Sequence, residues 1–194
     1  MTILAFFQNM WVESPKAVYK MLDRNKDNPM FWNQTCKNLM FMGCKTGRVL
    51  RQAFGDLADK MIYDECTKEI CNNPKTIPKA DYKHIRETIK RIKPEIIITF
   101  GEVAFKAVNW EHGRLRNPAV LIKCPHPAAR QVDTATTLRM TAEAIQEYIK
   151  YNKGCSVCKA PNPHWVKIVY DFLCDKCDGE LADSFNAVNM ERKL

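Results

Sequence analysis

The chain has 194 residues, 46% of them hydrophobic and 27% charged, with a formal net charge of +8. This balance suits one compact α/β domain with a small appendage and excludes a disordered or collagen-like chain. Because no apolar run approaches the roughly 20 residues of a membrane-spanning helix, and the first residues lack the basic region and cleavage site of a signal peptide, we expect a cytoplasmic protein that does not enter a membrane.

The first 80 residues predict two strands and two helices from their apolar spacing and turn signals. Residues 25–33 are polar around a turn at Asn28-Pro29, and residues 39–43 are apolar and end at Gly43. The predicted elements are a buried strand at 2–7, a helix from 15 to about 22, a helix at 47–54 and a strand around 60–63.

The clearest predicted helix follows Asp81, whose side chain can cap it, and has isoleucines at 85, 89 and 92 on one face. Residues 95–101 form a β-branched run typical of a strand buried on both faces. Then come a helical face at 104–108, a strand at 119–124 and a helix from about Thr134. The repeated strand–helix order predicts a three-layer α/β/α fold with a short central parallel sheet. Such sheets gather active residues in the loops after the carboxyl ends of their strands.

Two Cys-x-x-Cys pairs, separated by fifteen residues, occupy the last part of the chain. Each pair lets two thiolates reach one metal from a tight turn, and two such pairs complete a tetrahedron. The β-rich stretch 165–173 between them is typical of a ribbon hairpin. The spacing therefore predicts a structural Zn²⁺ in a C-terminal zinc ribbon, and a redox dithiol is the less favoured alternative. The predicted ligands are Cys155, Cys158, Cys174 and Cys177.

These observations divide the chain into an α/β domain at 1–150 and a zinc-ribbon module with a tail at 151–194. The first part holds 24 basic and 16 acidic residues, whereas the second holds six of each. The excess positive charge thus lies on the α/β domain and suggests a polyanionic partner. A basic composition that serves only solubility is the alternative.

The loops after the first and last predicted strands carry the most informative motifs. Residues 7–11 read Phe-Gln-Asn-Met-Trp, and residues 126–129 read His-Pro-Ala-Ala. Together with Phe-Met-Gly at 41–43, Gly-Arg-Val-Leu at 47–50 and the run 93–101, this order resembles the uracil-DNA glycosylase superfamily over roughly residues 2–150. The resemblance implies hydrolysis of the bond between a base and its sugar in DNA, after the nucleotide is flipped out of the helix.

The resemblance assigns roles to three residues of these loops. His126 matches the family histidine that donates a hydrogen bond to the base oxygen where negative charge develops. Asn9 matches the residue that holds the attacking water, and as an amide it orients water but is a poor base. Gln8 matches a position that contacts the base. The alternative for Gln8 and Asn9 is a polar pair that satisfies turn backbone.

This sequence departs from the family pattern in two places. Phe7 and Met10 replace a glycine and a proline of the first loop. Asp64 and Glu65 stand where the uracil-selective branch has an asparagine, and a carboxylate there would accept a hydrogen bond from an exocyclic amine. Cytosine-type or modified bases are therefore as plausible as uracil. A solvated surface pair is the alternative for these two carboxylates.

Further residues are candidates for binding the nucleotide. Trp11 or Phe7 can stack on the flipped base, although Phe7 equally suits a core. Arg130 follows the histidine loop and can contact phosphate. Gly43 precedes Lys45, Thr46 and Arg48, which can bind phosphate at the start of a helix.

The sequence thus predicts a monomeric DNA glycosylase that acts on a modified or unusual pyrimidine in double- or single-stranded DNA. No lysine stands beside the loops to form a Schiff base with the sugar, so we expect hydrolysis alone. The alternative is a catalytically inactive nucleic-acid-binding module of the same fold, which the altered first loop favours. A nucleotide-processing enzyme is a third possibility, for which the ribbon has no obvious use.

Overall fold

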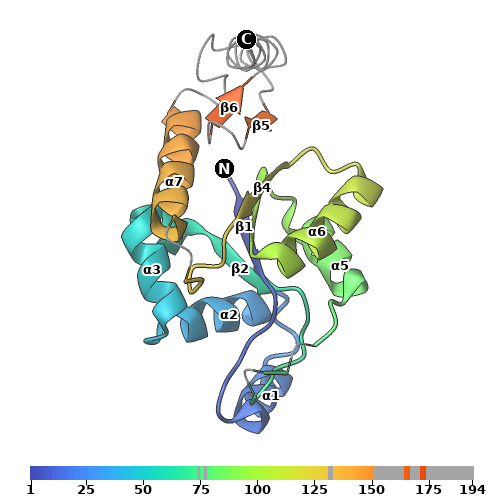
Figure 1. Cartoon of the computed structure of the whole chain (residues 1–194). Coiled ribbons are helices and arrows are strands. Elements are labelled where there is room, and N and C mark those ends of the chain that lie inside the picture. Colours follow the sequence, from blue (N-terminus) through green and yellow to red (C-terminus); the bar gives the residue numbers. More distant parts are fainter. Residues whose placement is uncertain (74, 77, 131–132, 151–163, 167–170, 174–194) are drawn as a thin grey trace, which may run out of the picture. The chain divides into compact units, whose positions relative to one another are not determined.

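The computed structural model describes residues 1–73, 75–76, 78–130, 133–150, 164–166 and 171–173 (Figure 1). The chain divides into two compact units, Met1–Leu138 and Arg139–Leu194. The first unit contains a parallel sheet with its helices, and the second contains most of α7 (Thr134–Lys150) and two short strands. None of the described helices has the length and hydrophobicity that a membrane-spanning segment needs.

A four-stranded parallel sheet organises the first unit, in the order β2-β1-β3-β4. Every residue of β1 and β3 is buried, as expected for central strands covered on both faces. The order of strands reverses at β1, and in such sheets a ligand binds outside the carboxyl ends at this reversal. The strands are β1 (Ile3–Phe7), β2 (Ile62–Glu65), β3 (Ile96–Phe100) and β4 (Val120–Cys124).

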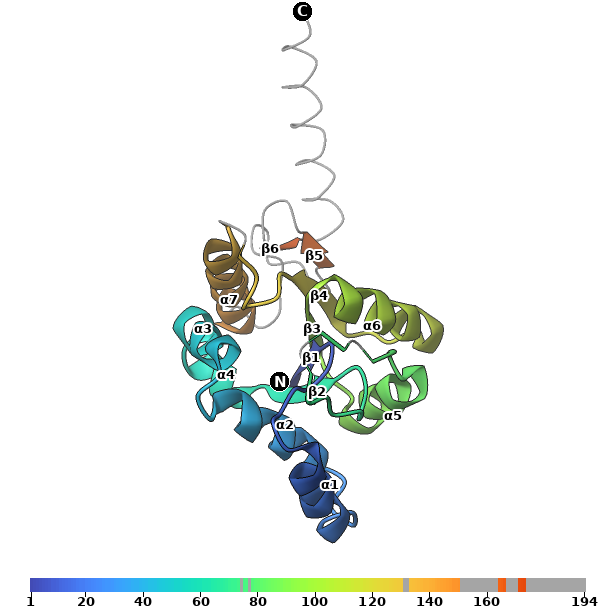
Figure 2. The ribbon, with the colours of Figure 1, turned by 60° about the horizontal axis from the view of Figure 1, so that its bottom comes forward.

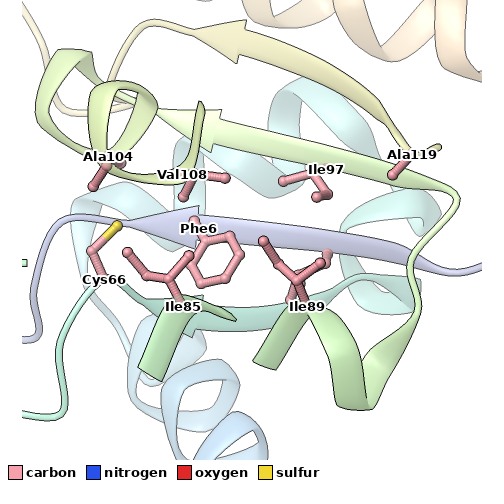
Figure 3. Close-up of a cluster of buried hydrophobic side chains, with 10 residues drawn as sticks. Phe6, Cys66, Ile85, Ile89, Ile97, Ala104, Val108 and Ala119 are labelled. Carbon is pink, nitrogen blue, oxygen red and sulfur yellow. The ribbon is translucent and has the colours of Figure 1, made fainter. Parts of the chain in front are cut away.

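One face of the sheet is covered by α5 (Tyr82–Ile92) and α6 (Glu102–Leu115). An apolar cluster fills the space between these helices and the central strands, as Figure 3 shows. Phe6 of β1 lies there with Ile85 and Ile89 of α5, and all three side chains are fully buried. This cluster is a fully buried apolar core between the sheet and the two helices.

Local sequence sets the position of α5. Its cap is Asp81, whose carboxylate accepts a hydrogen bond from the backbone N–H of His84 at 3.0 Å. On its outer side, the guanidinium of Arg86 donates two hydrogen bonds to the buried carboxylate of Glu111 on α6. The helix is therefore fixed by its cap, its apolar face and a charged tie to its neighbour.

Three helices lie on the other side of the strands, and Figure 2 shows α3 and α4 across the sheet from α5 and α6. Aromatic rings fill this second face. Phe7 of β1 stacks on Phe100 of β3 with ring centroids 4.6 Å apart, and Phe54 packs edge-on against Phe100. The three helices are α2 (Phe31–Phe41), α3 (Lys45–Phe54) and α4 (Asp56–Lys60). In the same unit, α1 (Pro15–Arg24) contributes no buried residue.

The first turn of α3 packs directly on the end of α2 at Gly47. A β-carbon at this position would overlap the carbonyl oxygen of Met40 and crowd the ring of Phe41. Glycine has no β-carbon and allows this approach. Beside it, the Cys44 thiol donates a hydrogen bond to the Met40 carbonyl at 2.9 Å and accepts one from the Gly47 N–H. The two helix ends thus form one closely packed wall.

The predicted α/β fold, with a parallel sheet between helices, is confirmed. The strands expected at 2–7, 95–101 and 119–124 correspond to β1, β3 and β4. The turn at Asn28 is also present, since its side chain accepts a hydrogen bond from the Met30 N–H at 3.0 Å. The sequence did not predict α2, which begins at Phe31 inside the stretch expected to be polar and non-helical.

The described part of residues 151–194 is an antiparallel pair of short strands, β5 (His164–Val166) and β6 (Asp171–Leu173). Trp165 lies opposite Phe172 in this pair. The strands fall in the stretch where a ribbon hairpin was expected. All four predicted zinc ligands, Cys155, Cys158, Cys174 and Cys177, lie outside the described residues, so the zinc ribbon stays a prediction.

Candidate active site at the carboxyl edge of the sheet

A cavity of about 320 Å³ lies at the carboxyl edge of the sheet. Its wall combines the chain that follows β1, the last residue of β2, the loop after β4, and residues of α2 and α3. Clefts of this size and mixed lining are typical of small-ligand sites. The lining residues are Phe7, Gln8, Asn9, Met10, Trp11, Cys36, Leu39, Met40, Cys44, Thr46, Glu65 and His126.

The loop after β1 is held by main-chain bonds rather than by its own polar side chains. Cys71 donates its N–H to the Met10 carbonyl at 3.0 Å, and its carbonyl accepts the N–H of Val12 at 2.9 Å. Within the described residues, the side chains of Gln8 and Asn9 have no hydrogen-bond partner. They therefore do not satisfy the turn backbone, which was the alternative to a functional role, and both face the cavity.

His126 enters the cavity from a short loop between two prolines. Its Nδ1 lies 3.1 Å from the backbone N–H of Ala128 and accepts a hydrogen bond from it. The proton of the neutral ring is therefore on Nε2, and since no described residue accepts it, Nε2–H is available as a donor. Burial lowers the pKa of His126, which favours this neutral form.

The position of the His126 ring is fixed by its packing. The ring meets Phe7 edge-on with centroids 5.8 Å apart. Gly101 lies on another side of His126 and has a φ of 95°. A β-carbon at Gly101 would lie 3.6 Å from the His126 β-carbon, which is an ordinary contact distance. A non-glycine residue would be strained at that φ, so Gly101 allows the turn from β3 into α6 to pass close beside the histidine.

Glu65 is the buried acid of the cavity. The residue is 5% exposed, and its Oε2 has no hydrogen-bond partner among the described residues. Burial, and secondly the negative charge of Asp64, raise the pKa of Glu65 well above that of an ordinary glutamate. Such a setting favours the neutral, protonated form of a carboxyl group. The alternative of a solvated pair at 64 and 65 is therefore wrong.

Asp64 points away from the cavity into a cluster of hydrogen-bond donors. Its carboxylate lies 2.6 Å from Trp32 Nε1 and 3.0 Å from Asn33 Nδ2 on α2. On α5, His84 Nε2 and Thr88 Oγ1 each lie 2.9 Å from it. The structure thus gives Asp64, the carboxylate predicted to bind the substrate, a role in tying α2, β2 and α5 together. Its neighbour Glu65 lines the cavity in its place.

The other predicted binding residues lie in three different settings. Trp11 lines the cavity and is 47% exposed, whereas Phe7 is 3% exposed and stacked in the core. Gly43 is exposed at the turn between α2 and α3, with a φ of 110°, and does not line the cavity. Arg130 is exposed beyond the histidine loop and is also not among the lining residues.

The α2 side of the cavity was not foreseen from the sequence. Cys36, Leu39 and Met40 line it, and their helix gave no clear pattern. Burial raises the pKa of the Cys36 thiol, which makes it an inert wall residue rather than a nucleophile. Among the described residues no group of three or more His, Cys, Asp or Glu side chains is placed to hold a metal ion.

Residues 10–151 match the family model described as the uracil DNA glycosylase superfamily. The matched range includes Glu65, the wall formed by α2 and α3, and His126, and it begins one residue after Asn9. No curated protein and no solved structure matches the chain.

Proposed function

The chain belongs to the uracil DNA glycosylase superfamily, and on that premise we propose that it is a DNA glycosylase that releases a modified or unusual pyrimidine from DNA by hydrolysis. One observation carries the proposal. The loop after β1, the end of β2 and the loop after β4 bring Asn9, Glu65 and His126 to the wall of one cavity. A single base, flipped out of the DNA helix, is a ligand of suitable size and polarity for it.

One residue of the cavity acts on the departing base and another acts on the attacking water. When the bond from the base to the sugar C1′ breaks, the electron pair leaves with the base, and a water oxygen forms the new bond to C1′. The Nε2–H of neutral His126 stabilises the negative charge that develops on a base oxygen. The Asn9 amide orients the water, whose proton passes to solvent, because an amide is a poor base. Slow turnover follows.

The other lining residues of the cavity bear on how the base is bound and on which product forms. The face of Trp11 offers a stacking surface to the base. Among the described lining residues there is no lysine, which supports hydrolysis without a Schiff base to the sugar. The positive charge of residues 1–150 suits a DNA backbone, single- or double-stranded.

The C-terminal module adds a structural metal to this proposal. Four thiolates, from Cys155, Cys158, Cys174 and Cys177, would bind one Zn²⁺ and leave no open position for a substrate. Such a small module would depend on its metal for folding. Native mass spectrometry of the whole chain tests this directly, and a mass without zinc would contradict the ribbon.

The central experiment is a panel of single- and double-stranded oligonucleotides that carry uracil, mismatched thymine or modified pyrimidines. Alkali treatment then reveals abasic sites as strand breaks. We expect release from at least one substrate, with strong loss in Asn9→Ala and His126→Ala. Asn109→Ala, which removes an exposed amide of α6, is the matched control and should behave as the wild type.

A non-catalytic nucleic-acid-binding module remains the second candidate, because Phe7 and Met10 alter the first loop. This candidate predicts salt-sensitive DNA binding with no abasic product across the whole panel.

A further inference from the structure

Two adjacent carboxyl groups at the end of β2 have opposite surroundings. Asp64 is surrounded by donors from α2 and α5, and it also accepts the backbone N–H of Glu65 at 2.8 Å. In the part of the chain that the structure describes, the buried Oε2 of Glu65 has no partner, and this side chain lines the cavity instead. Since an unpaired buried polar atom costs free energy, an unpartnered carboxyl in a binding cavity points to a ligand that completes its hydrogen bonds.

The groups around Glu65 do not supply a compensating positive charge. The titratable side chains that line the cavity with it are Cys36 of α2, Cys44 at the cap of α3 and His126 after β4. No lysine or arginine of the described residues joins them. On its own strand the neighbours are Asp64 and, just after the strand, Cys66, whose thiol pKa is raised by burial. With no positive charge beside it, burial favours the protonated form of this acid.

A protonated carboxylic acid has one O–H donor and one C=O acceptor side by side. We propose that the neutral acid of Glu65 reads the edge of the flipped base through this donor and acceptor, and so selects pyrimidines whose pairing edge has one acceptor next to one donor. This inference rests on the proposed function. An ionised carboxylate can only accept hydrogen bonds, so it would favour a base with an exocyclic amine and would not recognise a neighbouring acceptor.

The recognised class follows from the bases themselves. Uracil-type rings present N3–H beside O4, and cytosine-type rings present an N4 amine beside N3, so both match the acid in opposite senses. A ring methylated at N3 has lost its donor or its acceptor there and gained a methyl group, so it does not match. Glu65 thus excludes N3-blocked bases, and the choice between uracil and cytosine types belongs to other lining groups.

Binding can be measured without base release by using oligonucleotides with a 2′-fluorine on the target nucleotide, which resists hydrolysis of the glycosidic bond. We expect tight binding of the uracil- or cytosine-type probe and at least about tenfold weaker binding of its N3-methylated partner. For the wild type, affinity should fall by about tenfold per pH unit once the pH exceeds the pKa of Glu65, because only the neutral fraction binds.

The variant Glu65→Gln keeps a donor and an acceptor and cannot ionise. It should retain affinity and lose the alkaline decline, whereas Glu65→Ala should bind weakly at every pH. Glu69→Gln, at a nearby exposed glutamate, is the matched control and should follow the wild type. Circular dichroism of each variant identifies any that has not folded. If Glu65→Ala is unfolded, the pH dependence of Glu65→Gln, whose side chain has nearly the same shape, is sufficient to test the inference.

Infrared difference spectroscopy of wild type against Glu65→Gln reads the charge state without DNA. A protonated carboxylic acid band at neutral pH supports the inference, and its absence overturns it. Equal affinity for the N3-methylated probe, or the same alkaline decline in Glu65→Gln, also overturns it. If the probes bind with the expected dependence on Glu65 but no base is ever released, this inference stands and the glycosylase proposal fails.

Discussion

The two faces of the sheet in the first unit differ in what fills them. The face under α5 and α6 is closed by apolar side chains such as Phe6 and Ile89, which are fully buried. The face under α2 and α3 is aromatic near the sheet and, at the carboxyl edge, becomes a cavity whose polar groups include Glu65 and His126. The first face therefore contributes to stability alone, whereas the second contributes both to stability, through buried rings such as Phe54 and Phe100, and to the proposed chemistry.

The largest effect is expected from Phe6→Ala on the face under α5 and α6. Removing a fully buried phenylalanine should lower the free energy of unfolding by about 3–5 kcal/mol, which is a large part of the stability of a small protein. Urea unfolding followed by circular dichroism measures this change. Val103→Ala, at an exposed position of α6, is the control, and a loss as large there would contradict the division between the faces.

His126→Ala on the cavity face should leave stability nearly unchanged and lower activity by about 10²–10³-fold, or about 2.7–4 kcal/mol of transition-state stabilisation. The measurement is single-turnover base release on the substrate found in the panel. In the wild type, the lowered pKa of His126 means that the ring stays neutral to a lower pH than an ordinary histidine does. Activity should therefore persist into mildly acidic pH. Loss of activity near neutral pH would contradict the neutral donor.

Asn9→Asp should increase turnover, because a carboxylate can accept the proton of the attacking water. A gain of about 10²-fold is the lower end of what general-base catalysis contributes. Single-turnover rates measured against pH should show a new acidic limb from the introduced carboxyl group. Asn109→Asp on α6 adds the same charge away from the cavity, and an equal gain in that variant would assign the effect to overall charge.

A smaller effect is expected from Asp81→Ala at the cap of α5. Loss of the hydrogen bond to the His84 N–H should cost about 0.5–2 kcal/mol, measured as a shift in the urea midpoint, with activity unchanged. Lys83→Ala, two residues beyond the cap in the first turn of the same helix and exposed, is the comparison. A change in base release caused by Asp81→Ala would show that α5 and the cavity are coupled through the Asp64 cluster.

The sequence predicted the central strands and the loops of the site because their signals are local. The isoleucine run before Phe100 identifies a buried strand, and Asp81 marks a helix start. The loops with Asn9 and His126 follow strands of a parallel sheet, so their meeting at one edge is a consequence of topology.

What the sequence could not predict depends on long-range packing. The helix α2 has no side-chain hydrogen bond at its Met30 cap, and its position depends on contacts with β2, such as that of Asn33 with the Tyr63 carbonyl. The two carboxylates at the end of β2 are a matter of register. Successive residues of a strand face opposite sides of the sheet. Which of Asp64 and Glu65 faces the cavity therefore depends on how β2 pairs with β1, and the sequence alone does not give this register.

The contact at Gly47 has a consequence for how this cavity can change. Because a β-carbon at residue 47 would meet the Met40 backbone, any larger residue there would push the start of α3 away from the end of α2. Room for a larger base would come from shorter side chains at lining positions such as Met10, Leu39 or Met40. Gly47 therefore fixes how closely the two helices approach, and the side chains that line the cavity set the space left for a base.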